Sequence, residues 1–239
     1  MAPCDTATIL ESKCGRTDMT VILIIRHGEA DQVGTRLLGR MPGIHLTARG
    51  RTQARSLATN LEGCGVAALF TSPIERAAET ASEIAAELDM TPIVLPGIIE
   101  LEFGGWTGKL FEELYSLKEW TRFNSARTDT CPPGGESMRH VQARAIAALS
   151  QSADAYSGKI IAAITHADVI RAVLAAWLPM SLNEVWRIEI GLASITAIEL
   201  DGSQPRVLLV NGLSGERGLR LLSSPEGPAG TIVERKPQY

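Results

Sequence analysis

Apolar residues fall into two patterns along the chain: short unbroken runs, and longer stretches in which they recur every three or four positions. The runs are aliphatic and rich in β-branched residues, which is typical of strands buried on both faces of a sheet. Four such runs lie at 20–25, 66–71, 92–95 and 159–165. The stretches with the helical period predict helices that begin at Thr47, near Ser72, at Glu136 and near residue 167.

Strands that alternate with helices predict a three-layer α/β sandwich, in which helices flank a mainly parallel sheet. The segment 97–135 is rich in glycine and aromatic residues and is interpreted as an insertion above the sheet, with short helices near 109–124. Residues 186–211 predict two or three further strands. The helix near Ser72 shows a capping box, because Glu75 follows the serine by three positions.

These elements predict one domain over residues 20–211. Residues 1–19 lack the basic and then apolar pattern of a signal peptide, and we expect them to form a flexible extension. The segment 212–239 shows no strong period, and we expect it to be partly mobile.

The composition is that of an ordinary globular protein of 239 residues, 45% of them hydrophobic and 21% charged. The net charge of −4 argues against a broad basic surface for nucleic acid. No apolar run approaches the roughly 20 residues that span a bilayer, so no membrane partner is expected. The 4 cysteines form no CxxC pair, and 4 histidines argue against a zinc cluster. We therefore expect a cytoplasmic protein; the sequence indicates no oligomeric state.

Candidate chemistry appears where three of the predicted strands end. Arg26 and His27 follow the first strand, Arg76 lies in the first turns of the helix after the second, and His166 follows the fourth. Ligands of open α/β sheets bind beyond the carboxyl ends of the strands. If these strands are neighbours, two arginines and two histidines converge on one place. Such a group suits a dianion, above all a phosphoryl group.

Each of these residues also has a purely structural interpretation. Arg26 could form a surface ion pair, and His27 could form a hydrogen bond at a strand end. Arg76 could pair with Glu79 or Glu83 along its helix, and His166 could cap a helix. The conjunction favours a site, because four such groups at neighbouring strand ends would repel one another without an anion. His45 and His140 lack this setting and are interpreted as loop or surface residues.

A histidine beside a bound phosphoryl group can serve as nucleophile, base or hydrogen-bond donor. As a nucleophile it must be neutral, and a leaving alcohol then needs a proton from a general acid. Glu100 and Glu102 lie in the glycine-rich segment, which is suited to placing a carboxyl group over the pocket. For Glu102 a solvated loop charge is the favoured interpretation.

At this point the sequence resembles the histidine phosphatase superfamily, also called the phosphoglycerate mutase-like family, over about residues 20–211. The opening motif is Arg26-His27-Gly28-Glu29. Further matching segments follow in order at 46–54, 72–81, 100–108, 133–137 and 165–171. The resemblance implies that no metal or other cofactor is needed. It also implies the roles of the site residues: His27 as the phosphorylated nucleophile, Glu100 as the proton donor, and Arg26, Arg76 and His166 as ligands of the phosphoryl oxygens.

The resemblance implies a phosphomonoester hydrolase that acts on a phosphorylated small molecule. A phosphoglycerate mutase is the first alternative and a non-catalytic phospho-ligand binding module the second. Against the mutase, Val33 and Phe103 stand where that branch usually has polar residues, and the segment 109–131 is not net basic. Against the binding module, a binding site needs no proton donor. Arg40 is equally compatible with a substrate contact and with a surface role.

Overall fold

The computed structural model describes residues 19–200 and 205–212. The expected N-terminal extension and C-terminal segment lie outside these residues, apart from Met19 and Gly212. Among the described residues, no helix has the length and apolar character needed to cross a membrane.

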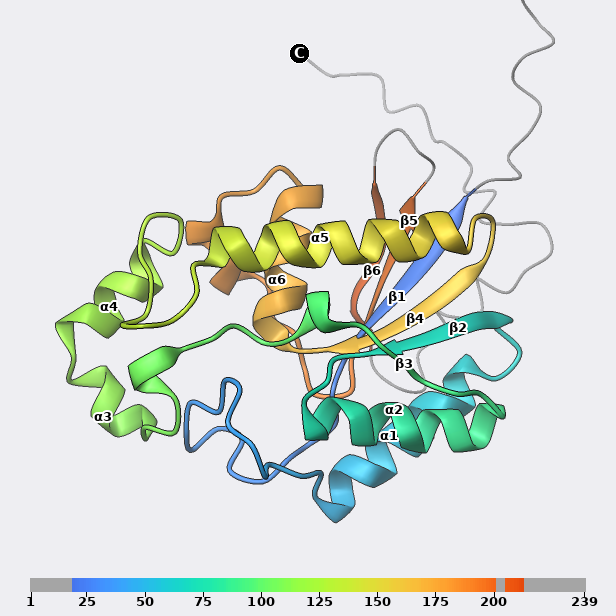
Figure 1. Cartoon of the computed structure of the whole chain (residues 1–239), viewed down its shortest axis with the longest axis horizontal. Helices are drawn as coiled ribbons and strands as arrows, with labels where there is room; N and C mark the ends of the chain where they lie inside the picture. Colours follow the sequence, from blue (N-terminus) through green and yellow to red (C-terminus); the bar gives the residue numbers. More distant parts are fainter. Residues whose placement is uncertain (1–18, 201–204, 213–239) are drawn as a thin grey trace, which may run out of the picture.

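A six-stranded sheet runs through the centre of the molecule in the order β3-β2-β4-β1-β5-β6 (Figure 1). Its strands are β1 (Thr20–Arg26), β2 (Val66–Thr71), β3 (Ile93–Val94), β4 (Ile160–Thr165), β5 (Ile195–Leu200) and β6 (Arg206–Gly212). The first four strands are parallel, whereas β5 pairs in antiparallel fashion with both of its neighbours. The predicted mainly parallel sheet is therefore confirmed.

Helices cover both faces of the sheet and complete the three predicted layers (Figure 1). One face carries α1 (Ala48–Leu61) and α2 (Glu75–Leu88), and the other carries α5 (Met138–Ala155) and α6 (Ala167–Trp177). The insertion after β3 contains α3 (Phe111–Tyr115) and α4 (Lys118–Ser125). Single-turn or two-turn 3-10 helices lie at Pro96–Ile98, Gly104–Trp106 and Leu182–Arg187.

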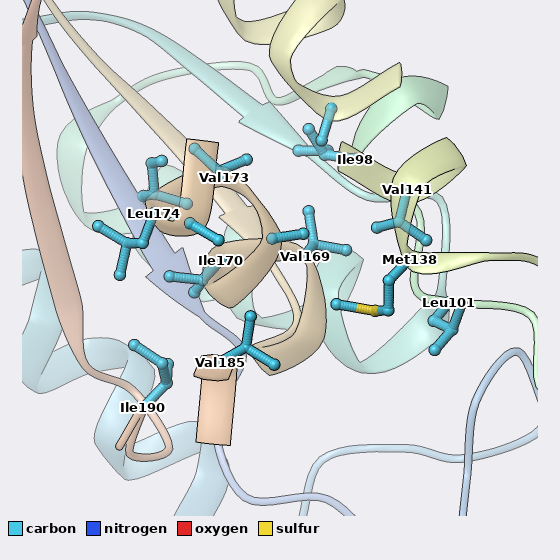
Figure 2. Close-up of a cluster of buried hydrophobic side chains, with 14 of the residues drawn as sticks. Ile98, Leu101, Met138, Val141, Val169, Ile170, Val173, Leu174, Val185 and Ile190 are labelled. Carbon is cyan, nitrogen blue, oxygen red and sulfur yellow. The ribbon is translucent and has the colours of Figure 1, made fainter. Parts of the chain in front are cut away.

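The alternation of side chains along β1 explains why two hydrophobic cores form. Ile22 and Ile24 belong to the cluster beneath α5 and α6, whereas Leu23 and Ile25 belong to the cluster beneath α1 and α2. All four side chains are fully buried, as the unbroken aliphatic run predicts. Figure 2 shows part of the first cluster around α6.

The capping box predicted at Ser72 is wrong. The helix α2 begins at Glu75, its N-cap position is Ile74, and no side chain caps it. The Ser72 hydroxyl lies 2.8 Å from the Nε2 atom of His166, and the Glu75 carboxylate accepts a hydrogen bond from the main-chain N–H of Gly43 at 3.0 Å. Both side chains thus bind long-range partners that local sequence does not reveal.

Candidate active site

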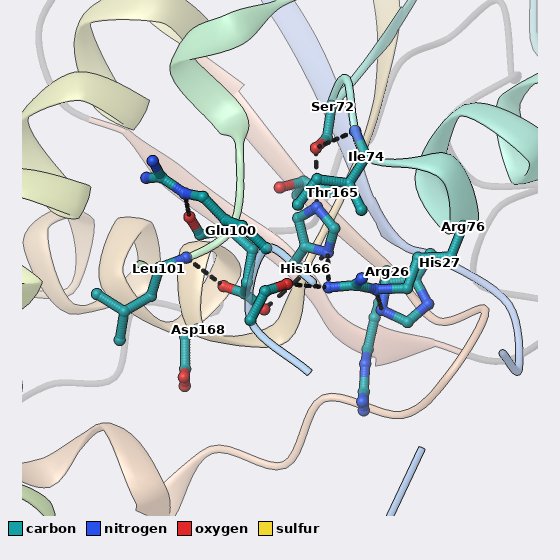
Figure 3. A network of polar contacts seen from close by, with 12 residues as sticks. Arg26, His27, Ser72, Ile74, Arg76, Glu100, Leu101, Thr165, His166 and Asp168 are labelled. Carbon is teal, nitrogen blue, oxygen red and sulfur yellow. Dashed lines mark hydrogen bonds and ion pairs between the residues drawn. The ribbon is translucent and has the colours of Figure 1, made fainter. Parts of the chain in front are cut away.

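The three strand ends singled out in the sequence do lie side by side. In the sheet, β4 lies between β1 and β2, with Arg26 opposite Thr165 and Thr71 opposite Ile164. Because all three strands are parallel, the residues that follow them meet at one edge. The structure brings Arg26, His27, Arg76, Glu100 and His166 together there (Figure 3). All of these except His166 line a cavity of about 210 Å³.

His27 is buried, and its hydrogen bonds define its tautomer. The Nδ1 atom lies 2.7 Å from the carbonyl oxygen of Gly28, which can only accept, so Nδ1 carries the hydrogen. The Nε2 atom accepts a hydrogen bond from Arg76 Nε at 3.2 Å and therefore holds the lone pair. Burial, and then the charges of Arg76 and Arg26, hold the pKa of His27 well below its usual value. His27 is thus a neutral imidazole whose unprotonated Nε2 atom faces Arg76.

Close main-chain packing fixes the turn that follows His27. The N–H of Gly28 donates to the Thr80 hydroxyl at 3.0 Å. A Cβ atom added to Gly28 would lie 2.7 Å from the carbonyl oxygen of Gly50, and one added to Gly50 would collide with the carbonyl oxygen of Glu29. Both positions therefore require glycine because two backbones touch there.

Arg76 is the centre of the cationic group. It is 2% exposed, and its NH2 atom donates to the Gly39 carbonyl at 2.8 Å and lies 3.3 Å from Nδ1 of His166. Its NH1 atom has no hydrogen-bond partner within the described part of the chain. The ion pairs with Glu79 or Glu83 considered from the sequence are not formed, because those carboxylates bind Arg51 and Arg55 instead. Arg76 is therefore positioned toward the cavity.

His166 is fully buried and lies between Arg76 and Ser72. Because a guanidinium group only donates, the contact at 3.3 Å indicates an unprotonated Nδ1, and Nε2 then donates to the Ser72 hydroxyl at 2.8 Å. Burial, and then the charge of Arg76, lower the pKa of His166 well below its usual value. Arg26 completes the group with one hydrogen bond, from NH1 to the Ile190 carbonyl at 2.6 Å, while its buried Nε has no partner in the described residues.

Glu100, not Glu102, is the carboxyl group at the cavity. Burial, followed by the charge of Asp168, raises the pKa of Glu100 to about 7. Its Oε2 atom lies 4.0 Å from Nδ1 of His166, and its Oε1 accepts a hydrogen bond from the main-chain N–H of Leu101 at 2.8 Å. The Glu102 side chain is 34% exposed and does not line the cavity. Glu100 is thus placed to exchange a proton near neutral pH.

Arg40, His45 and His140, which were also weighed from the sequence, do not line the cavity. Arg40 donates to the Glu100 carbonyl at 2.8 Å and to the Glu136 carboxylate at 2.8 Å, so it holds the loop that carries Glu100. The side chains of His45 and His140 are exposed, as predicted. Through these two contacts Arg40 supports the loop that carries Glu100, without lining the cavity itself.

The sequence analysis did not assign several residues to the cavity that line it in the structure: Arg36, Arg127, Asp168, Arg171 and Trp186. It also did not predict that Ser72 holds His166. Arg127 carried no signal, since charges of both signs surround it along the chain. Asp168 and Arg171 could have been found, because both lie in the first turns of the helix that starts beside His166.

The charged residues of the segment 109–131 are not all placed alike in the structure. Basic and acidic residues balance along this segment. Of its charged residues, however, only Arg127 lines the cavity. The segment therefore contributes a positive charge to the site although it is not net basic. Val33 and Phe103 do line the cavity and make that part of its wall apolar, as expected.

The geometry indicates the kind of chemistry that the site can support. A neutral buried histidine beside two guanidinium groups, with a carboxyl group that holds its proton near neutral pH, suits phosphoryl transfer through a covalent histidine intermediate. Among the described residues, no group of three or more His, Cys, Asp or Glu side chains is arranged to hold a metal ion.

The chain belongs to the histidine phosphatase superfamily (branch 1), whose sequence profile matches residues 22–212. Phosphoserine phosphatase 1 of Hydrogenobacter thermophilus is 27% identical over 198 residues, which cover 81% of this chain and 92% of that protein. Among solved structures, YhfR of Bacillus stearothermophilus has a TM-score of 0.76 at 30% identity and covers 82% of this chain and 98% of its own. A phosphoserine phosphatase mutant of Entamoeba histolytica in complex with phosphoserine has a TM-score of 0.73 at 27% identity, covering 80% and 96%.

Proposed function

We propose that this enzyme hydrolyses phosphate monoesters of small molecules by two successive displacements at His27. Its family and its named phosphatase relatives make it a phosphoric monoester hydrolase. The tautomer of His27 is the observation that supports its role as nucleophile. In this tautomer Nε2 is unprotonated and lies 3.2 Å from Nε of Arg76. The hydrogen bond from Nδ1 to the Gly28 carbonyl keeps the ring in that tautomer.

In the first displacement, the lone pair of His27 Nε2 attacks phosphorus and the bond to the ester oxygen breaks. The electron pair of that bond goes to the ester oxygen, which takes the proton of Glu100. A pKa of about 7 keeps a substantial share of Glu100 protonated at neutral pH, as a general acid requires. The product alcohol leaves, and a phosphoryl group remains on His27.

In the second displacement, water attacks the phosphoryl group and Glu100, now a carboxylate, takes a proton from it. The bond between phosphorus and Nε2 breaks, its electrons return to the imidazole, and phosphate leaves. Arg26 and Arg76 stabilise the oxygens of the transferring group in both steps, and His166 does so when its Nδ1 atom takes a proton, a form that the negative charge of a bound phosphoryl group favours. Arg76 NH1 and Arg26 Nε are buried donors that have no partner in the described part of the chain, and they are available for this role.

The alternative is a phosphoglycerate mutase, in which the phosphoryl group returns from His27 to the substrate. The apolar side chains of Val33 and Phe103 in the cavity wall disfavour it, whereas Arg36, Arg127 and Arg171 place cationic groups in the same cavity. The assay below therefore decides between the two activities. We also propose that the enzyme acts in the cytoplasm, where an exposed free thiol such as Cys131 stays reduced.

The test is phosphate release from a panel of phosphomonoesters that includes phosphoserine, phosphoglycerates and p-nitrophenyl phosphate. We expect phosphate release by the wild-type enzyme, its loss in His27→Ala, and slow interconversion of 2- and 3-phosphoglycerate. Interconversion at ordinary enzymatic rates, about 1–10³ per second, with negligible phosphate release would establish the mutase instead. Tight binding of phosphomonoesters without turnover would establish the binding module.

A further inference from the structure

We propose that Arg40, Glu136 and Arg144 are positioning residues for the proton transfer, and that they act by holding the main chain at Glu100. The three side chains are called here the carbonyl clamp. Both arginines donate to the carbonyl oxygen of Glu100, and Glu136 joins them. None of the three lines the cavity. The inference rests on the proposed function, in which Glu100 protonates the leaving oxygen, and adds residues that act through that group.

The carboxyl group of Glu100 has few contacts of its own to fix its position. Within the described residues, its only hydrogen bond comes from the main-chain N–H of the adjacent Leu101, at 2.8 Å (Figure 3). Its Oε2 atom lies 4.0 Å from Nδ1 of His166, which is beyond hydrogen-bond distance. The position of the carboxyl group in the cavity therefore depends on where the main chain at Glu100 is held.

The carbonyl oxygen of Glu100 accepts hydrogen bonds from two guanidinium groups. Arg40 Nε donates to it at 2.8 Å, and Arg144 NH2 donates at 3.2 Å. Arg40 lies in the loop between β1 and α1, whereas Arg144 belongs to α5. Arg144 NH1 also donates to the carbonyl oxygen of Gly97 at 2.7 Å. One side chain thus ties this loop to α5 at two points.

Glu136 joins the two arginines into a closed ring of contacts. Its Oε2 atom accepts from Arg40 NH2 at 2.8 Å and from Arg144 NH2 at 3.0 Å, and its Oε1 atom accepts from Arg144 Nε at 2.8 Å. Burial opposes the ionisation of Glu136, but the hydrogen bond and charge of Arg144, and then the charge of Arg40, lower its pKa. The main-chain N–H of Glu136 also donates to the Glu102 carbonyl at 2.8 Å. The ring therefore holds the main chain on both sides of Leu101.

Stability alone explains these buried charges poorly. The side chains of Glu136 and Arg144 are only 8% and 15% exposed. A buried ion pair adds little net stability, because the cost of removing its charges from water offsets their attraction. Its hydrogen bonds are directional, however, and they fix an oxygen atom more precisely than apolar packing would. A displacement of about 1 Å can cost about 100-fold in rate. Precise placement of the main chain at Glu100 therefore has a direct effect on proton transfer.

The experiment compares two alkyl phosphates, phosphoserine and glycerol 3-phosphate, with p-nitrophenyl phosphate, whose leaving group scarcely needs a proton. The measured quantity is kcat/KM, which reports the first displacement, the step in which Glu100 acts as an acid. Arg144→Met should lower kcat/KM by about 10- to 100-fold for the alkyl phosphates and much less for the aryl phosphate. Arg144→Lys keeps the charge and a donor, and should recover part of the alkyl activity.

Arg139→Met is the matched control. Arg139 belongs to the same helix as Arg144, but its side chain is 65% exposed and donates to the carbonyl oxygen of Thr128. Because it does not contact the main chain at Glu100, its removal should leave kcat/KM unchanged for both kinds of substrate.

Two further measurements apply even if Arg144→Met fails to fold. Arg40 is the most exposed member of the carbonyl clamp, at 28%, and Arg40→Met should produce the same loss, confined to alkyl phosphates. In a Glu100→Gln background, Arg40→Met should lower kcat/KM no further, because a residue that acts only through Glu100 then has no acid to position. Equal losses on alkyl and aryl phosphates, or losses that add to that of Glu100→Gln, would overturn the carbonyl clamp.

Failure of the proposed function has a different signature. If the wild type releases phosphate from none of the three substrates, or if Glu100→Gln loses activity equally on all of them, Glu100 is not the acid and the carbonyl clamp falls with it. A loss confined to alkyl phosphates in Glu100→Gln, together with unaltered kcat/KM in Arg40→Met and Arg144→Met, would overturn the carbonyl clamp alone.

Discussion

Glu100→Gln offers the sharpest test of the electrostatics at the site. The pKa of Glu100 rises from 4.5 to about 7 on folding, because burial, and then Asp168, disfavour its ionised form. Below pH 4.5 the carboxyl is protonated in both the folded and unfolded states, so its burial adds no charge-related cost to the free energy of folding. Between pH 4.5 and 7 the unfolded state ionises first, so the folded state loses stability as the pH rises.

The size of this loss follows from the shift. One pKa unit corresponds to about 1.36 kcal/mol, so the shift is worth about 3 kcal/mol at pH 8. Glutamine has no charge to bury. The free energy of unfolding of Glu100→Gln, minus that of the wild type, should therefore grow by up to about 3 kcal/mol from pH 4.5 to pH 8.

Urea denaturation at a series of pH values measures this difference directly. Glu102→Gln is the matched control, because it removes the same group two residues away and outside the cavity. A difference for Glu100→Gln that stays constant with pH would refute the buried, protonated carboxyl.

Glu100→Gln should also lose about 10²–10⁴-fold in turnover of alkyl phosphates, and less on aryl phosphates, whose leaving groups scarcely need a proton. An equal loss on both would indicate a binding role.

The remaining predictions concern the packing around the histidines. Gly50→Ala should lower the free energy of unfolding by about 1–3 kcal/mol, because its methyl group meets the Glu29 carbonyl; Arg49→Ala in the same helix should change it by less than about 0.5 kcal/mol. Equal stability of the two variants in urea denaturation would contradict the close backbone contact. Ser72→Ala should also cost about 1–3 kcal/mol and reduce kcat, since it leaves Nε2 of His166 without its partner. A Ser72→Ala enzyme with unchanged stability and kcat would count against this hydrogen bond.

The sheet and the residues at its strand ends were predictable from the sequence, because local sequence determines them. The aliphatic run of β1 is buried on both faces, and its end places Arg26 and His27 at the carboxyl edge. Convergence with Arg76 and His166 needed one further condition, that β2, β4 and β1 be neighbours, which the sheet order meets.

The rest of the cavity depends on contacts between distant segments. Ser72 looked like a helix cap, but its hydroxyl binds His166, 94 positions away. Arg127 looked like one of several balanced charges, yet it alone among them lines the cavity, stacked on Trp186. A count of charge along the chain cannot distinguish a side chain that faces solvent from one that faces a ligand, so this part of the site required the fold.

The central claim is a phosphoryl group carried on His27, and rapid quenching with a radiolabelled phosphomonoester tests it most directly. Label should remain on the wild-type protein, stable in alkali and labile in acid, and peptide mapping should place it on His27. His27→Ala should carry no label, whereas His45→Ala, which alters an exposed histidine outside the cavity, should be labelled like the wild type. Steady phosphate release by the wild type with no label at any quench time, or equal labelling of His27→Ala, would contradict the mechanism.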